Sequence, residues 1–161
     1  MLFRSAGITD PTARGRVVVL FDADGDGDQD LFIGDQDVRG DGAPSMSRLL
    51  RNNGSGRFTW DFGSGLTMQI GIGCAHARDI DGDGDQDLIA CISLASPAAP
   101  GLKVFLNDRG LFRESGATLR VATIAEIDAD APDLNGDGHG DLVQLATDRI
   151  RISLWRRGGW Q

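Results

Sequence analysis

Aspartate occupies every second position in one short stretch of this 161-residue chain. The stretch covers residues 22–30 and contains Asp22, Asp24, Asp26, Asp28 and Asp30. Carboxylates this close together repel one another unless a cation lies among them, and hard oxygen donors select calcium or magnesium. A flexible, carboxylate-rich loop suits calcium, which takes roughly six to eight oxygen ligands, better than the strict octahedron of magnesium. The stretch therefore predicts a calcium-binding loop.

The same pattern occurs twice more, so the chain has three acidic loops. The second loop covers residues 79–87 and the third covers 133–141, with these residues at alternate positions: Asp79, Asp81, Asp83, Asp85, Asp87, Asp133, Asn135, Asp137, His139 and Asp141. If the first Asp of each loop is position 1, the side chains at positions 1, 3, 5 and 9 and the carbonyl of position 7 can surround one ion. Asn135 and His139 leave the third loop with two fewer formal charges, so we expect it to bind calcium most weakly.

Two other calcium-binding motifs do not fit. An EF-hand loop needs a bidentate Glu at about position 12, where this chain has Ile33, Ala90 and Gln144. A calcium β-roll repeats about every nine residues, whereas the three acidic loops begin 57 and 54 residues apart. The loops therefore belong to a longer repeat.

The repeat defines the domain organisation. Phe3, Phe58 and Phe112 are spaced 55 and 54 residues apart, in step with the loops. The chain is predicted to be one domain, 1–161, with repeats at approximately 1–56, 57–110 and 111–161. Short apolar runs between Gly, Asn and Asp predict four antiparallel strands per repeat. They are 2–4, 16–21, 31–34 and 47–51, then 57–62, 71–78, 88–93 and 102–106, then 111–114, 125–132, 142–146 and 150–155. Such small sheets must stack on one another to bury both faces.

These features resemble the FG-GAP or VCBS repeats of integrin alpha-type propellers. The resemblance rests on two loops of the form DxDGDGxxD and a third that departs from the other two at Asn135 and His139, on the segment RLLRNNGSGRF at 48–58, and on Asp-Leu followed by an apolar residue after each loop. It implies an all-β propeller of four-stranded antiparallel blades, three per chain, with three calcium ions. The implied side-chain ligands are Asp22, Asp24, Asp26, Asp30, Asp79, Asp81, Asp83, Asp87, Asp133, Asn135, Asp137 and Asp141. Asp28, Asp85 and His139 would bind through their carbonyl oxygens, so their side chains are predicted to be dispensable.

The two ends of the chain suggest a partner. Residues 2–4 match the strand that follows residues 47–51 in the repeat, and the third repeat stops before that strand. We expect a two-fold homodimer in which each N-terminal strand completes the partner's last blade, giving a six-bladed ring. The alternative is that other blades of a longer chain fill this place.

Composition limits the other partners. The chain has 16 basic and 24 acidic side chains, for a net charge of −8, and thirteen of the acidic residues lie in the loops. No basic stripe with interleaved aromatic residues indicates nucleic-acid binding, and no apolar run reaches the roughly 20 residues of a membrane span. We expect an extracellular or periplasmic protein whose signal sequence lies outside this sequence. Cys74 and Cys91 lie on paired strands, but a hairpin folded about Asp83 puts them one residue out of register, which favours free thiols over a disulfide.

Residues that could bind a ligand are scattered, and they are Asp35, Arg39, Asp41, Trp60 and His76. Arg39-Gly40-Asp41 spells an integrin-binding tripeptide, but three residues recur easily by chance, and a charged turn is the preferred interpretation. Trp60 could stack on a sugar or pack between blades, and Asp128 and Asp130 could form a polar row with His76.

Nothing in the sequence combines a nucleophile, a general base and an orienting group, so we do not expect an enzyme. The predicted function is a calcium-stabilised, non-catalytic binding module for glycans or protein partners. The alternative is a structural propeller domain, or a fragment of a larger secreted enzyme or toxin.

Overall fold

The chain folds into short β-strands joined by turns. The computed structural model describes residues 6–8, 15–35, 46–92, 101–116, 126–146, 149–156 and 159–160. The strands in these ranges are β1 (Gly15–Phe21), β2 (Asp30–Asp35), β3 (Arg48–Asn52), β4 (Phe58–Asp61), β5 (Ile72–Arg78), β6 (Asp87–Ile92), β7 (Gly101–Asp108), β8 (Leu111–Glu114), β9 (Glu126–Asp130), β10 (Leu142–Ala146), β11 (Ile150–Ser153), β12 (Trp155–Arg156) and β13 (Gly159–Trp160). Within these ranges the fold is all-β, and no helix is long and apolar enough to cross a membrane.

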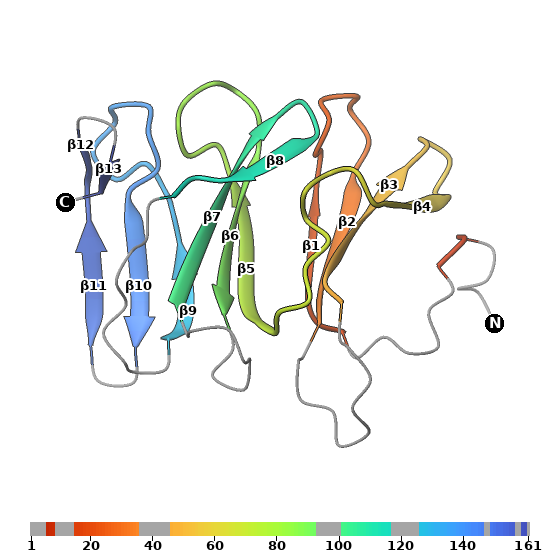
Figure 1. Ribbon diagram of the computed structural model, residues 1–161. Helices are drawn as coiled ribbons and strands as arrows, with labels where there is room; N and C mark the ends of the chain where they lie inside the picture. Colours follow the sequence, from red (N-terminus) through yellow and green to blue (C-terminus); the bar gives the residue numbers. More distant parts are fainter. Residues whose placement is uncertain are drawn as a thin grey trace, which may run out of the picture.

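The strands form separate sheets that follow the sequence repeat. Sheet 1 has the order β1-β2-β3-β4 and sheet 2 the order β5-β6-β7-β8, and every neighbouring pair is antiparallel. Figure 1 shows sheet 1, sheet 2 and the strands of the third repeat side by side, like the blades of a propeller. The predicted four-stranded antiparallel unit is therefore confirmed for the first two sheets.

The third repeat gives a smaller unit. Sheet 3 has the order β11-β10-β9, and β12 and β13 form a separate two-stranded hairpin. Trp155 pairs with Trp160 in that hairpin, with the two rings 4.8 Å apart in an edge-on contact. The described residues thus give sheet 3 three of the four predicted strands. The predicted N-terminal strand at 2–4 lies outside the described residues.

Side chains alternate between the two faces of each sheet and build two cores. Phe21, Phe32 and Leu49 of sheet 1 pack with Leu88 and Phe112 of sheet 2. The opposite face of sheet 2 packs on sheet 3 through a second cluster, whose members are Cys74, Ile80, Ile89, Cys91, Leu102, Val104, Ala129, Ala131 and Leu142. Each internal junction is therefore an apolar layer between two sheets.

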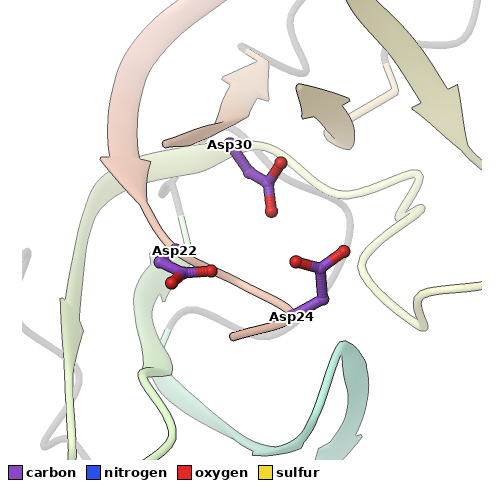
Figure 2. Close-up of side chains that lie close together, drawn as sticks. All are labelled: Asp22, Asp24 and Asp30. Carbon is purple, nitrogen blue, oxygen red and sulfur yellow. The ribbon is translucent and has the colours of Figure 1, made fainter. Parts of the chain in front are cut away.

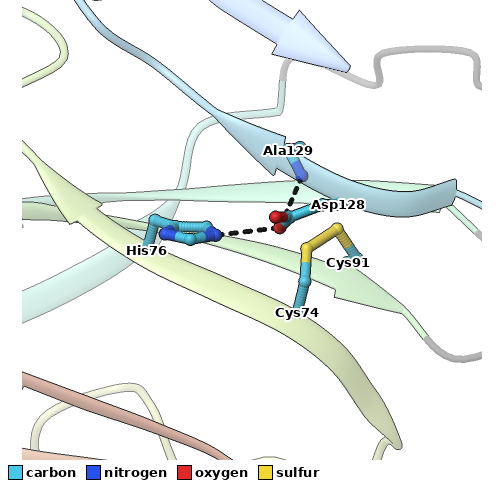
Figure 3. Close-up of a disulfide and its surroundings, with 5 residues drawn as sticks. All are labelled: Cys74, His76, Cys91, Asp128 and Ala129. Carbon is cyan, nitrogen blue, oxygen red and sulfur yellow. Dashed lines mark hydrogen bonds and ion pairs between the residues drawn. A yellow bond between two sulfur atoms is a disulfide. The ribbon is translucent and has the colours of Figure 1, made fainter. Parts of the chain in front are cut away.

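The two cysteines correct one prediction. They form a disulfide in the second core, with their Cα atoms 4.9 Å apart (Figure 3). Cys74 pairs directly with Cys91 because the β5–β6 hairpin has Arg78 opposite Asp87, so it folds about the Gly82–Asp83 bond. The free-thiol prediction was wrong because it folded the hairpin about the Asp83 residue, half a residue away.

A glycine in the link between sheets 1 and 2 allows the two sheets to approach closely. The Phe112 N–H donates to the Ser64 carbonyl over 2.7 Å. Gly65 has φ +88°, and a Cβ atom there would overlap the Phe112 carbonyl oxygen. Gly7 is placed in the same way against Phe58, whose carbonyl oxygen would lie 2.7 Å from an added Cβ. The junction thus requires a residue without a side chain.

We predict that Gly65→Ala destabilises the fold more than the matched variant Gly56→Ala. Both glycines have positive φ, but an added Cβ at Gly56 meets nothing within 4 Å. Gly56→Ala should cost about 1–2 kcal/mol for the backbone conformation alone, and Gly65→Ala should cost about 2 kcal/mol more because of the overlap. Urea unfolding measures both values, and equal losses would contradict this account of the junction.

Candidate metal centres

Each acidic loop is folded around the aspartate at position 1. In the first loop, the Gly25 and Gly27 N–H groups donate to the two carboxylate oxygens of Asp22 over 2.8 and 2.9 Å. Asp79 and Asp133 accept the same two bonds, over 2.8 and 3.1 Å and over 2.7 and 3.0 Å. The loop glycines adopt positive φ, which lets the backbone wrap around this carboxylate. The three loops therefore share one backbone shape.

The aspartate at position 9 is buried and ties the loop to its sheet. Asp30, Asp87 and Asp141 are each at most 1% exposed. One oxygen of each accepts the N–H of loop position 2, over 3.2, 2.8 and 2.9 Å. The other accepts an N–H from the third strand of the repeat, at Asn52, Asn107 and Trp155, over 2.8, 2.7 and 2.8 Å. The position 9 carboxylate therefore accepts one N–H group from its own loop and one from a later strand, and so links the loop to that strand.

The carboxylates at positions 1, 3 and 9 converge in the first two loops. Asp22, Asp24 and Asp30 each offer an oxygen within 4.8 Å of the others, and Asp79, Asp81 and Asp87 do the same. Figure 2 shows the first three carboxylates directed toward one common space. These two groups could hold a metal ion.

The predicted ligand at position 5 is arranged differently. Asp26 and Asp83 are outside the two converging groups. Their Oδ1 atoms accept the N–H of position 7 over 2.8 and 2.9 Å, and Asp137 accepts that of His139 over 3.0 Å. Position 5 therefore stabilises the turn in this structure, and its role as a ligand stays a prediction.

The side chains at position 7 face the neighbouring turn of the same sheet. The Asp85 carboxylate accepts the Arg109 N–H over 2.9 Å. The Asp28 carboxylate lies against Gly54, 2.6 Å from where a Cβ would be. Neither is part of the converging groups, and the prediction that these side chains are dispensable for metal binding stays a prediction.

The third loop differs in the donors it presents. The Asn135 amide lies 3.4 Å from Asp141 Oδ1 and donates to it. The Asn135 amide N–H thus partly satisfies the buried Asp141 carboxylate, which a cation would do in the other two loops. The expectation that the third loop binds calcium most weakly stays a prediction.

Burial without a cation raises the pKa of several loop carboxyls. Burial raises the pKa of Asp87 to about 6; hydrogen bonds from Asn107 and Ile80 oppose this shift, and the charges of Asp81 and Asp83 add to it. The pKa of Asp81 is also raised, by burial and by the charge of Asp83.

Burial also raises the pKa of a carboxyl group in the first loop, and one carboxylate oxygen there has no hydrogen-bond donor. Burial raises the pKa of Asp24, although the charge of Arg51 opposes the shift. Asp24 Oδ1 is buried and accepts no hydrogen bond. An unsatisfied buried oxygen beside two more carboxylates is a site that a hard cation would satisfy. The donors present therefore fit calcium.

Two contacts missed by sequence reasoning join the loops to one another. The Asn107 side-chain amide donates to the Ala23 and Gln86 carbonyls, 2.9 Å each, and so bridges the first two loops. The Gly140 N–H donates to the Ile80 carbonyl over 2.8 Å and joins the last two. Both contacts cross between sheets, so local sequence patterns do not reveal them.

Two of the predicted ligand-binding residues, Asp35 and Trp60, both lie against Arg48, whose guanidinium carbon is 5.3 Å from the Trp60 ring centroid. Asp35 is 1% exposed and lies 3.9 Å from the Arg48 guanidinium. Trp60 stacks on Phe62, with ring centroids 4.5 Å apart. Arg39 and Asp41 lie outside the described residues.

The predicted polar row is paired across sheets 2 and 3. His76 Nε2 lies 2.9 Å from Asp128 Oδ1 (Figure 3), and Arg78 donates to Asp130 over 2.9 Å. These pairs account for both carboxylates within the protein. They hold β5 and β9 together beside the disulfide.

Comparison with known proteins supports the repeat assignment. Residues 22–90 match a family model described as an FG-GAP-like repeat. The match begins at the first acidic loop and includes the whole of the second. Comparison with curated proteins finds no match. The predicted resemblance is thus confirmed for this segment, which is similar to FG-GAP-like repeats.

Proposed function

We propose that the chain is a calcium-stabilised, non-catalytic β-propeller module that binds glycans or protein partners. The observation that carries the proposal is the convergence of Asp22, Asp24 and Asp30, repeated at the second loop. FG-GAP-like repeats are generally cation-binding, and this chain places the converging groups within such a repeat.

The proposed role of calcium is structural. Position 9 links the first two loops to the third strand of their sheets and the third loop to Trp155 of β12, so an ion held there would also hold two strands. The proposed set is three ions per chain, with the third loop weakest. A site filled by protein oxygens leaves no open position for a substrate, unlike a catalytic metal centre.

The outer face of sheet 1 supports further stacking. Val18 and Leu20 of β1 are 65% and 59% exposed. Leu20, Leu31, Leu50 and Trp60 pair in register across the four strands and form one row on this face. We call the face carrying Val18 and this row the N-terminal open face.

The corresponding positions in the other sheets are buried. The β1–β2 and β5–β6 registers match Val18 with Ala75 and Leu20 with Ala77. Both alanines are 7% exposed because sheet 1 covers them. The N-terminal open face is therefore a stacking face without its neighbour.

The outer face of sheet 3 is open in the same way. Leu145, Ile150 and Ile152 are 40%, 67% and 57% exposed, and the pairs Leu145–Ile150 and Val143–Ile152 lie on one face. The matching face of sheet 2, with Ile89 and Val104, is buried against sheet 3. We call this second surface the C-terminal open face.

These two faces support closure of the ring. We propose that two chains pair so that each N-terminal open face meets the partner's C-terminal open face, with exchange of the N-terminal strand, in a six-bladed two-fold ring. Other blades of a longer chain are the alternative neighbours.

The proposed compartment is extracellular or periplasmic. A disulfide between Cys74 and Cys91 is typical of oxidising compartments. FG-GAP-like repeats are typical of extracellular proteins, which agrees with this placement.

Calcium should raise the melting temperature, and EDTA should lower it. Each filled site stabilises the fold by about 2.7 kcal/mol at a hundredfold excess of ion over its dissociation constant. Asp87→Asn should remove the calcium effect at the second loop. Asp108→Asn, which changes an exposed carboxylate outside the loops, should keep it. Differential scanning calorimetry measures these shifts, and a melting temperature indifferent to calcium would refute the structural role.

Without divalent cations, stability should increase as the pH falls from 7 to 4. The folded chain holds a proton on Asp87 with a pKa of about 6, whereas the unfolded carboxyl titrates near ~3.9. This contribution is complete below pH ~4 and is lost as the pH rises through ~6, and it amounts to about 3 kcal/mol. Urea unfolding in EDTA should show a weaker pH dependence for Asp87→Asn than for the unmodified chain. The same slope in both would contradict the assignment.

A closed ring should sediment as a dimer in calcium, and Ile152→Asp should yield monomers. Leu111→Asp is the matched control, because Leu111 is 52% exposed and outside both open faces. Sedimentation velocity distinguishes the two states, and a monomer of unmodified chain at micromolar concentration would exclude the ring.

Binding of the dimer on a glycan array supports the recognition module, whereas an inert chain favours the structural domain of a larger secreted enzyme or toxin.

A further inference from the structure

The first acidic loop is contacted by Arg51, whose equivalents in the other two repeats are leucines. Arg51 follows Leu50 in β3, and the β2–β3 and β6–β7 registers match it with Leu106 in sheet 2. The corresponding residue after Ser153 in the third repeat is Leu154. Leu106 lies within β7, so strand formation at this position does not require the arginine.

The Arg51 guanidinium lies among the first-loop carboxylates. Its Nη1 atom is 3.0 Å from Asp30 Oδ2 and 3.6 Å from Asp24 Oδ2. Its Nε atom donates to Asp61 over 2.9 Å, and its Nη2 atom donates to the Gly110 carbonyl over 2.8 Å. The group therefore contacts two of the three converging carboxylates and the neighbouring sheet.

The surroundings hold the guanidinium in place. The Arg51 side chain is only 18% exposed. A Cβ atom at Gly110 would lie 2.6 Å from Arg51 Nη2 and 3.1 Å from the Asp24 Cβ, so only a glycine leaves room for this contact. A planar group with four directed contacts loses little freedom when it binds, in contrast with a mobile surface charge.

The second loop has no such group. Among the described side chains, no Arg, Lys or His forms an ion pair with Asp79, Asp81 or Asp87. Asp87 is bonded to backbone N–H groups of Ile80 and Asn107. Its charge is thus opposed by dipoles alone.

We propose that Arg51 is the resident cation of the first loop, and that the second loop is the main divalent-cation site of the chain. A divalent ion at the first loop must share Asp24 and Asp30 with a positive group, so it binds there more weakly. The proposal rests on the proposed function for the second loop. The part of the proposal that concerns Arg51 does not depend on calcium binding. It states that the first loop keeps its structure and its contact with sheet 2 when no metal is bound.

Arg51→Leu, which installs the residue found in the other two repeats, tests the proposal. Arg57→Leu is the matched control, because Arg57 is exposed and its loss changes the net charge equally. Calcium titration calorimetry should show first-loop binding at least tenfold tighter in Arg51→Leu than in Arg57→Leu. Adding Asp24→Asn to Arg51→Leu should abolish the gain. In the unmodified chain, Asp81→Asn should remove the tightest site, and Asp24→Asn should leave it.

A second measurement concerns the metal-free state. In EDTA, Arg51→Leu should melt at a lower temperature than Arg57→Leu, and calcium should restore much of the difference. If Arg51→Leu does not fold, Arg51→Lys decides the matter: it keeps the charge, so first-loop affinity should stay within about threefold of the unmodified chain. A tenfold gain in Arg51→Lys would overturn the proposal.

The two proposals fail in different ways. If no variant binds calcium, the calcium function is wrong, while a lower melting temperature of Arg51→Leu in EDTA still supports the resident cation. If calcium binds but Arg51→Leu matches Arg57→Leu in both affinity and melting temperature, the Arg51 proposal alone is wrong. It is also wrong if Asp24→Asn removes the tightest site of the unmodified chain.

Discussion

The buried aspartate at position 9 of each acidic loop is the interaction on which the rest of this structure depends. A carboxylate that is at most 1% exposed must have its oxygens satisfied inside the protein. Asp30, Asp87 and Asp141 meet this demand by accepting N–H groups from the loop and from the third strand. The position 9 carboxylate therefore closes the hairpin and holds a later strand. In the first two loops it is also one of the three converging carboxylates.

Because each buried aspartate needs a group that opposes its charge, the three loops can have the same backbone conformation and differ in that group. The glycine and aspartate positions that shape the loop are present in all three. What varies is the group that opposes the buried charge, which is a guanidinium at the first loop and an amide at the third. At the second loop backbone dipoles act alone, and the Asp87 pKa is raised to about 6. Loops with the same backbone geometry can thus differ in how far protein groups already neutralise their carboxylates.

Sequence reasoning was most successful where the signal was local or repeated. Asp at alternate positions, Gly at the turns and short apolar runs predicted the hairpins of sheets 1 and 2. The predicted ligand set was positions 1, 3, 5 and 9, of which positions 1, 3 and 9 converge in the first two loops. The cysteine pairing failed because a half-residue error in the folding point of the β5–β6 hairpin changes every partner. Arg51 and Asn107 were missed because their important contacts cross to another sheet, and no spacing within one repeat encodes such a contact.

The alanines of the inner strands have a consequence for assembly as well as for packing. Ala75 and Ala77 allow β5 to lie close to sheet 1, and Ala129 and Ala131 do the same for β9 against sheet 2. Close approach on the inner side fixes how far each sheet turns relative to the last. A unit with two unlike adhesive ends forms a closed ring when that turn divides a full circle, and an open helical filament when it does not. In the proposed ring, the small alanine side chains on β5 and β9 would therefore help to set the angle that decides between closure and continued growth.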